Sequence, residues 1–119
     1  MSTYTVNDAA VRQARRLIDD GSYDTTTEWS DAAPSTDDEN RVVERDGYEG
    51  FGAWHLAIDP EASEDTKGRY AFPYGDFARV NRAALIHAKQ RAAQNGHDAI
   101  ERAADALLGH LDEVTGASS

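Results

Sequence analysis

Apolar residues near the N-terminus of the chain recur at helical spacing. A helix over residues 8–20 would carry four of them on one face: Val11, Ala14, Leu17 and Ile18. Its opposite face would carry three arginines: Arg12, Arg15 and Arg16. Asn7 precedes this pattern as a helix-capping residue, and Gly21 follows it where a glycine commonly ends a helix. The pattern therefore predicts a helix over residues 8–20 with its arginines exposed.

The most regular amphipathic pattern lies near the C-terminus. It places five apolar residues along one face: Ile100, Ala104, Leu107, Leu111 and Val114. Asp98 and Glu101 have the spacing of a capping box, in which Asp98 would cap the first turn. We therefore predict a helix over residues 99–114.

Another helical pattern covers residues 77–94. Gly75 and Asp76 provide a turn and a capping carboxylate before it. Its apolar arc has six members: Phe77, Val80, Ala84, Leu85, Ala88 and Ala92. The alanines lie four residues apart and form a ridge that another helix can approach closely. The short connection after residue 94 predicts that helices 77–94 and 99–114 form an antiparallel hairpin.

Aromatic residues mark the middle of the chain. Tyr70, Phe72 and Tyr74 alternate, so an extended segment would place their three rings on one face. Pro73 would confine that segment to a sheet edge or to an unpaired arm. Residues 48–58 are predicted to form a short helix with its aromatic side chains inward, and a strand over residues 54–58 is the alternative.

The stretch before these residues is acidic and rich in turn-forming residues. We expect Trp29 to anchor this loop onto the core, because a ring of that size is rarely left unpacked in a small domain. The acidic run over residues 37–40 lacks the spacing of an EF-hand loop. It predicts a capping cluster before a short helix over residues 39–44 rather than a metal site.

Together these patterns predict a single small, mainly α domain over residues 1–119. It would contain the N-terminal helix, an acidic middle anchored by aromatic side chains, and the C-terminal hairpin, with one short extended segment as an option. Residues 1–6 and 115–119 are expected to be flexible.

The charge composition of the chain indicates the environment in which the protein works. The chain has 22 acidic and 12 basic residues, a formal charge of −10, and only two lysines, Lys67 and Lys89. This balance resembles that of salt-adapted, haloarchaeal-type proteins, whose acidic surfaces stay hydrated in concentrated salt. An acidic protein of an ordinary environment is the alternative.

The start of the chain lacks the regions of a secretory signal, and no apolar run approaches the roughly 18 residues of a membrane span. We expect a cytoplasmic location, or one in a particle assembled there.

Residue patterns typical of catalysis are missing from the sequence. Cysteine is absent, which excludes disulfides and thiolate chemistry. The four histidines form no helical ligand pair and are expected at the surface. No serine or glycine motif for nucleophilic catalysis or phosphate binding is present. The sequence therefore predicts a protein that is not an enzyme and that holds no cofactor or metal.

One face of the predicted helix 77–94 is basic. Arg79, Arg82 and Lys89 would lie together there, with Ile86 among them. Because Ile86 has no evident core role on that side, we interpret the four residues as a surface for a protein partner or a second copy of the chain. A solvated basic face is the plain alternative. Nucleic acid is a further alternative, because the predicted helix carries four cations and no acid: Arg79, Arg82, Lys89 and Arg91. Four cations on a chain of charge −10 are a weak footprint.

Four blocks of sequence in order carry a resemblance to a known family: ARRLIDDGSYDTTTEWS from residue 14, STDDEN from residue 35, WHLAIDPEASEDTKGRYAFPYGD from residue 54, and VNRAALIHAKQRAAQNGHDAIERAADALL from residue 80. The chain resembles a domain of the head-gene modules of tailed viruses and proviruses, which is sometimes fused to or beside a prohead protease. The resemblance implies a structural or assembly role in a viral head, with a capsid or prohead-protease protein as partner. It carries over no catalytic or ligand residue.

Overall fold

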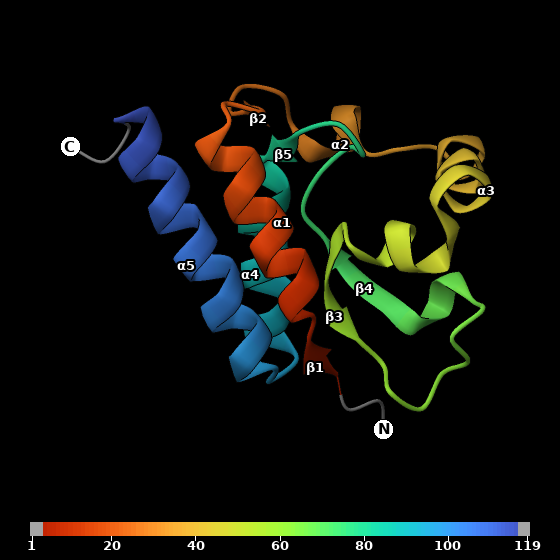
Figure 1. Ribbon diagram of the computed structural model, residues 1–119. Helices are drawn as coiled ribbons and strands as arrows, with labels where there is room; N and C mark the ends of the chain where they lie inside the picture. The colour runs from red at the N-terminus through yellow and green to blue at the C-terminus, as the bar shows by residue number, and fades with distance from the viewer. Residues whose placement is uncertain (1–3, 117–119) are drawn as a thin grey trace.

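Helices form most of the structure, a computed structural model that describes residues 4–116 (Figure 1). Its five helices are α1 (Asp8–Asp19), α2 (Trp29–Ala32), α3 (Thr36–Gly52), α4 (Arg82–Gln94) and α5 (Asp98–Thr115). A 3₁₀ turn, η1 (Lys67–Arg69), precedes β4. The five strands are β1 (Thr5–Val6), β2 (Tyr23–Asp24), β3 (His55–Ile58), β4 (Tyr70–Pro73) and β5 (Val80–Asn81). The prediction of a mainly helical chain agrees with this architecture, but the structure also contains a sheet.

The strands form one antiparallel sheet and one parallel pair. The sheet has the order β1-β3-β4, and β2 pairs with β5. In the sheet, Val6 pairs with Ala57 and Ala57 pairs with Ala71. Figure 1 shows α1, α4 and α5 grouped on one side of the molecule, with α3 and the larger sheet on the other.

The hydrophobic core lies where α1, α4, α5 and β3 meet. The helix α1 contributes Ala10, Ala14 and Ile18, each fully buried. The alanine ridge of α4 is buried as expected, together with Leu85. The stripe of α5 is buried from Ile100 to Leu111, whereas Val114 at its end is 43% exposed. The small alanine side chains allow α4 and α5 to pack closely along their length.

The two terminal helices agree well with their predicted ranges. Asn7 caps α1 by accepting a hydrogen bond from the backbone N–H of Ala10, and the three arginines of this helix are exposed. The predicted capping box of α5 is wrong, because His97 occupies the cap position and makes no side-chain capping bond. Gly116 ends α5 with a φ of 72°. The left-handed conformation at that position favours glycine.

The predicted start of the helix at residue 77 is wrong, because α4 begins at Arg82. Asp76 accepts hydrogen bonds from the backbone of Ala78 and Arg79 instead, and so closes a turn. Phe77 has a φ of 70°, which excludes it from a helix. Val80 and Asn81 then pair with β2, and the Asn81 side chain caps α4.

The middle of the chain also differs from prediction. The acidic cluster does cap a helix, through a box formed by Ser35 and Asp38, but α3 runs to Gly52 instead of residue 44. Gly47 breaks its regular geometry with a φ of 77°. The helix preferred for residues 48–58 is found only as far as Gly52, where α3 ends, and the alternative strand is found after residue 54, as β3.

The edge position of the segment with Pro73 is confirmed, since β4 is an outer strand of the sheet. The expectation that its three rings share one face is wrong. The Tyr70 ring lies against Phe51, whereas the Phe72 ring lies against Tyr4. Phe72 has a φ of 63°, so the regular alternation of an extended chain is broken there.

The terminal segments were expected to be flexible. Residues 1–3 and 117–119 lie outside the described residues. Within the described part the expectation is wrong at Thr5 and Val6, which pair with β3. Thr115 is likewise the last residue of α5.

Candidate functional site

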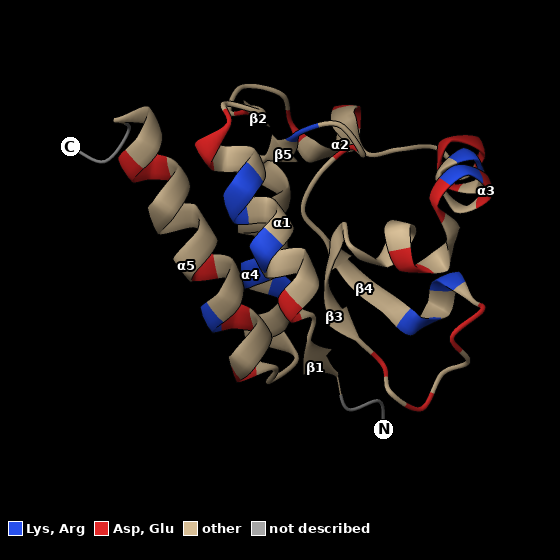
Figure 2. Ribbon diagram, viewed as in Figure 1, with Lys and Arg blue, Asp and Glu red and all other residues tan. Residues whose placement is uncertain are grey.

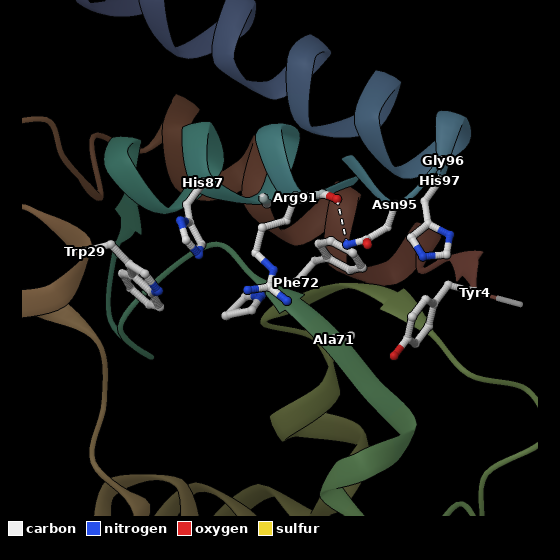
Figure 3. Close-up of a pocket in the computed structure, with 11 residues that line it drawn as sticks. Tyr4, Trp29, Ala71, Phe72, His87, Arg91, Asn95, Gly96 and His97 are labelled. Carbon is white, nitrogen blue, oxygen red and sulfur yellow. Dashed lines mark hydrogen bonds between the residues drawn. The ribbon is translucent and has the colours of Figure 1, made fainter. Parts of the chain in front are cut away.

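A groove of about 830 Å³ lies between the edge strand β4 and the helix α4 (Figure 3). We call it the β4–α4 groove. Ala71, Phe72 and Pro73 of β4 form one wall. The other wall is a face of α4, and its ends are closed by Trp29 on one side and by Tyr4 with His97 on the other. Segments from the beginning, the middle and the end of the chain therefore meet at this groove.

Three rings form the end of the groove near the N-terminus. The ring centroids of Tyr4 and Phe72 are 5.7 Å apart, those of Tyr4 and His97 are 5.2 Å apart, and those of Phe72 and His97 are 5.9 Å apart. All three pairs are edge-on, an arrangement that aromatic quadrupoles favour. The unusual backbone at Phe72 directs its ring into this cluster. Each of the three side chains remains half-buried, so the cluster still presents ring surface to the groove.

The α4 wall consists of residues on successive turns. His87, Arg91 and Asn95 lie four residues apart, which places them on one face of the helix, and Ala88 beside them is buried. The side chains of His87 and Arg91 are directed away from α4 into the groove (Figure 3). The Asn95 side-chain amide donates a hydrogen bond of 2.9 Å to the backbone carbonyl of Arg91, which also accepts one of 3.1 Å from the Asn95 backbone N–H.

The β4–α4 groove differs from the rest of the surface in charge. None of the residues that line it is Asp or Glu, although the chain contains 22 acidic residues. Figure 2 shows acidic residues on α1, α3 and α5 and in the loop before β4. Among residues 4–116, no carboxylate oxygen lies within 4.0 Å of the Arg91 guanidinium. The groove therefore offers a free cation beside aromatic walls.

Trp29 occupies a different place from the one expected. The first residue of α2, it lies half-buried at the groove. It is not among the described side chains that pack against the core cluster. The expectation that it anchors the acidic loop onto the core is therefore wrong, and its ring is available at one end of the groove.

The predicted partner surface is divided by the structure into two places. Arg82, Ile86 and Lys89 lie together along the contact between α4 and α5, beside a shallow hollow of about 440 Å³. Arg79 precedes α4, and its guanidinium lies 3.6 Å from Asp76 and 3.9 Å from Asp24. All four were expected on one helical face because the helix was predicted to begin at residue 77, five residues before the start of α4.

The cations beside α5 are paired within the chain. The Arg82 guanidinium donates two hydrogen bonds to the Asp112 carboxylate, at 2.9 and 3.1 Å. These bonds raise the pKa of Arg82 and lower the pKa of Asp112. Lys89 lies 2.8 Å from Asp105. Ile86, expected to have no core role, is half-buried and packs against the core cluster.

One histidine contradicts the expectation that all four lie at the surface. His55 is 6% exposed, and its Nδ1–H donates a hydrogen bond of 3.0 Å to the carbonyl of Phe51. Burial lowers the pKa of His55 to about 4, since the charged imidazolium loses its water there. His55 therefore stays neutral at physiological pH, and its interactions explain it as a structural residue.

Tyr74 is a second buried titratable residue. Its hydroxyl donates a hydrogen bond of 2.8 Å to the carbonyl of Ala53 and accepts one of 3.0 Å from the Gln13 amide. Burial raises the pKa of the Tyr74 phenol, so it remains protonated. With both hydrogen-bonding roles filled, this phenol joins α1 to the segment before β3.

The described residues contain neither a metal site nor a membrane span. Residues 4–116 hold no group of three or more His, Asp or Glu side chains placed to bind a metal ion. No helix in the same range is long and apolar enough to cross a membrane.

The β4–α4 groove was not predicted from the sequence, although the sequence contains one signal for it. Helix α4 has no acidic residue, and His87, Arg91 and Asn95 follow one another at four-residue spacing on it. The aromatic end could not be predicted, because Tyr4, Phe72 and His97 meet only through the sheet and the turn before α5. Comparison of the chain with models of protein families, with curated proteins and with solved structures gave no match.

Proposed function

We propose that this chain is a non-enzymatic protein-interaction module that serves as a structural or assembly component of a tailed-virus or provirus head. Its site of action would be the host cytoplasm or the particle. The observation that carries the interaction role is the β4–α4 groove, which combines aromatic walls with an unpaired Arg91 and has no acidic lining residue. Arginine and aromatic side chains are enriched where proteins bind one another. The resemblance of the sequence blocks supplies the viral context.

A protein partner fits the observed charges better than nucleic acid does. Of the four cations that suggested nucleic acid, Arg79, Arg82 and Lys89 each lie within 4.0 Å of a carboxylate of the chain, which leaves only Arg91 without such a partner among residues 4–116. Phosphate binding there would require these pairs to be broken, on a chain whose formal charge is −10. Binding of that kind also weakens steeply as salt rises, which disfavours it in a salt-adapted protein.

The contact line between α4 and α5 is a second candidate surface for a partner or a second copy of the chain. Ile86 lies there between the ion pairs of Arg82 and Lys89. Ile86→Asp should abolish an association made by this surface, and it should also lower the melting temperature without unfolding the chain, because Ile86 packs against the core cluster. If Ile86→Asp unfolds the chain, Ile86 acts as a core residue and this surface is not the contact.

Co-expression tests the assembly role directly. The chain would be produced together with any capsid or prohead-protease proteins that its neighbouring genes encode and applied to a size-exclusion column in 2 M KCl. We expect the chain to elute in a complex with one of them and to appear in purified particles or their precursors. Elution of the chain alone in every combination, with none in the particles, would overturn the proposal.

A further inference from the structure

We infer that the β4–α4 groove binds an extended, acidic segment of a partner protein that carries an aromatic side chain. This inference rests on the proposed function for the partner being a protein, and it adds the chemistry that the partner must present. Three features of the groove support it: its length, its charge and its aromatic ends.

The shape of the groove suits an extended chain. His87 and Asn95 are eight residues apart on α4, which corresponds to about 12 Å of helix. An extended chain covers that length with about four residues. The opposite wall is β4, an edge strand that runs along the groove (Figure 3). Extended peptides commonly bind beside such exposed strands.

The charge of the groove selects an acidic segment. Arg91 is exposed, has no carboxylate partner among residues 4–116 and reaches into the groove. A guanidinium can bind a carboxylate through two parallel hydrogen bonds. Such a contact pair persists in concentrated salt better than long-range attraction, which is screened beyond about 3 Å at 1 M. A basic segment would find carboxylates on most of the remaining surface but none in this groove.

The ends of the groove select an aromatic side chain. The cluster of Tyr4, Phe72 and His97 presents partly exposed rings at one end, and Trp29 does so at the other. A further ring can pack edge-on or offset against either end, which adds a favourable contact beyond the area that it buries. Arg91 lies between the two ends, so a carboxylate next to an aromatic residue in the segment could reach it.

The test is a titration of the full, ¹⁵N-labelled chain with short peptides in 2 M KCl, followed by NMR. The probe is acetyl-Ser-Asp-Trp-Glu-Ser-amide, and two matched peptides replace its acids with lysine or its tryptophan with alanine. We expect shifts of backbone signals along α4 and β4 with the probe. Each matched peptide should bind at least about tenfold more weakly, the loss expected when one charged or aromatic contact disappears.

Two arginine variants locate the contact. Arg91→Gln should weaken binding of the probe about tenfold. Arg12→Gln, which removes an exposed arginine of α1 outside the groove, should leave it unchanged. Unchanged spectra away from the substitution would show that both variants fold. Equal binding by the Arg91→Gln variant, equal binding of the lysine peptide, or shifts confined to the α4–α5 contact would each overturn the inference.

The outcomes separate the inference from the proposed function. If a head protein co-elutes with the chain and Arg91→Gln has no effect on that complex, the groove inference fails and the assembly role stands. If the probe binds in the groove but no head protein co-elutes, the assembly role fails and the groove inference stands. Displacement of the probe from the groove by a ten-nucleotide oligothymidylate would favour nucleic acid and overturn the protein occupant.

Discussion

The backbone conformation of Phe72 changes which residues the aromatic side chains of β4 contact. Its φ of 63° is rare for a bulky L-residue and costs on the order of 1–3 kcal/mol. The conformation separates the ring from that of Tyr70 and brings it to Tyr4 and His97. Strained residues of this kind concentrate at binding sites. The position of Phe72 in the wall of the β4–α4 groove fits that tendency.

His55 predicts how stability depends on pH. The unfolded histidine binds a proton below about pH 6.5, whereas the folded one does so only below about pH 4. As the pH falls from 6.5 to 4, the unfolded state gains the proton first, so the fold loses stability in that window. We expect this residue to lower the free energy of unfolding by about 2 kcal/mol between pH 7 and pH 5.

The matched variant for this prediction is His55→Gln, whose amide can still donate to the Phe51 carbonyl but does not titrate. Chemical denaturation at pH 7, 6 and 5 should show a smaller loss of stability for the variant than for the natural chain. The other three histidines are common to both proteins, so the difference between the two curves isolates His55. Parallel curves would show that burial of His55 does not control the acid sensitivity.

At the scale of the elements, α4 shows where local patterns fail. Asp76 has the features of a helix cap, and the apolar spacing does continue from Phe77. Long-range contacts decide otherwise, because Val80 pairs with Tyr23 of β2 and fixes residues 80–81 as a strand. Helix α1 was predicted well because its cap and its apolar face are both encoded locally.

Asn81 is the residue that starts α4, and its replacement should be costly. It is 1% exposed, its Oδ1 accepts from the Ala84 N–H at 2.9 Å, and its Nδ2 donates to the Thr27 carbonyl at 3.1 Å. Asn81→Ala should lower the free energy of unfolding by about 2–3 kcal/mol. Asn95→Ala, at the exposed end of the same helix, should cost less than about 1 kcal/mol. Equal losses in urea denaturation would contradict the role of Asn81.

Replacement of two helical glycines by alanine should change the stability of the chain in opposite directions. A Cβ at Gly52 would overlap the ring of Tyr70, which packs against Phe51 and His55 and cannot move freely. Gly52→Ala should therefore cost about 1–3 kcal/mol. A Cβ at Gly109 of α5 would meet no atom within 4 Å. Gly109→Ala should stabilise the chain by about 0.5–1 kcal/mol. Melting temperatures of both variants, compared with the natural chain, check the two signs.

At the scale of the whole molecule, the sequence predicted the strongly amphipathic helices but not the site. The stripe from Ile100 to Leu111 specifies a buried helical face without reference to any other segment. The β4–α4 groove depends on Tyr4 and His97 meeting Phe72, which requires the sheet register and the turn before α5. The ion pairs of the basic face could not be predicted for a similar reason, because Asp105 and Asp112 lie on another helix.

Screening of the acidic surface should control the stability of the whole molecule. Repulsion among 22 acidic residues opposes folding at low ionic strength, where charges interact over about 10 Å. We expect the melting temperature to rise by at least about 5 °C between 0.1 and 2 M KCl, which corresponds to roughly 1 kcal/mol.

A variant with fewer charges provides the control for this salt effect. Glu61, Glu64 and Asp65 are exposed, and among residues 4–116 no cationic group lies within 4.0 Å of their carboxylates. Their replacement by the corresponding amides should reduce the rise in melting temperature. A natural chain with the same melting temperature at both salt concentrations would contradict the salt-adapted interpretation.

The position of Tyr4 at one end of the β4–α4 groove affects where a second protein can be fused to this one. Because this residue closes one end of the β4–α4 groove, a fusion partner placed ahead of it would be attached within a few residues of that end. A linker there would hold its own acidic or aromatic residues at a high effective concentration beside Arg91 and would compete with a partner in trans. The last described turn of α5 lies at the opposite end of the molecule from β1 (Figure 1). Affinity tags and fluorescent reporters therefore belong at the C-terminus.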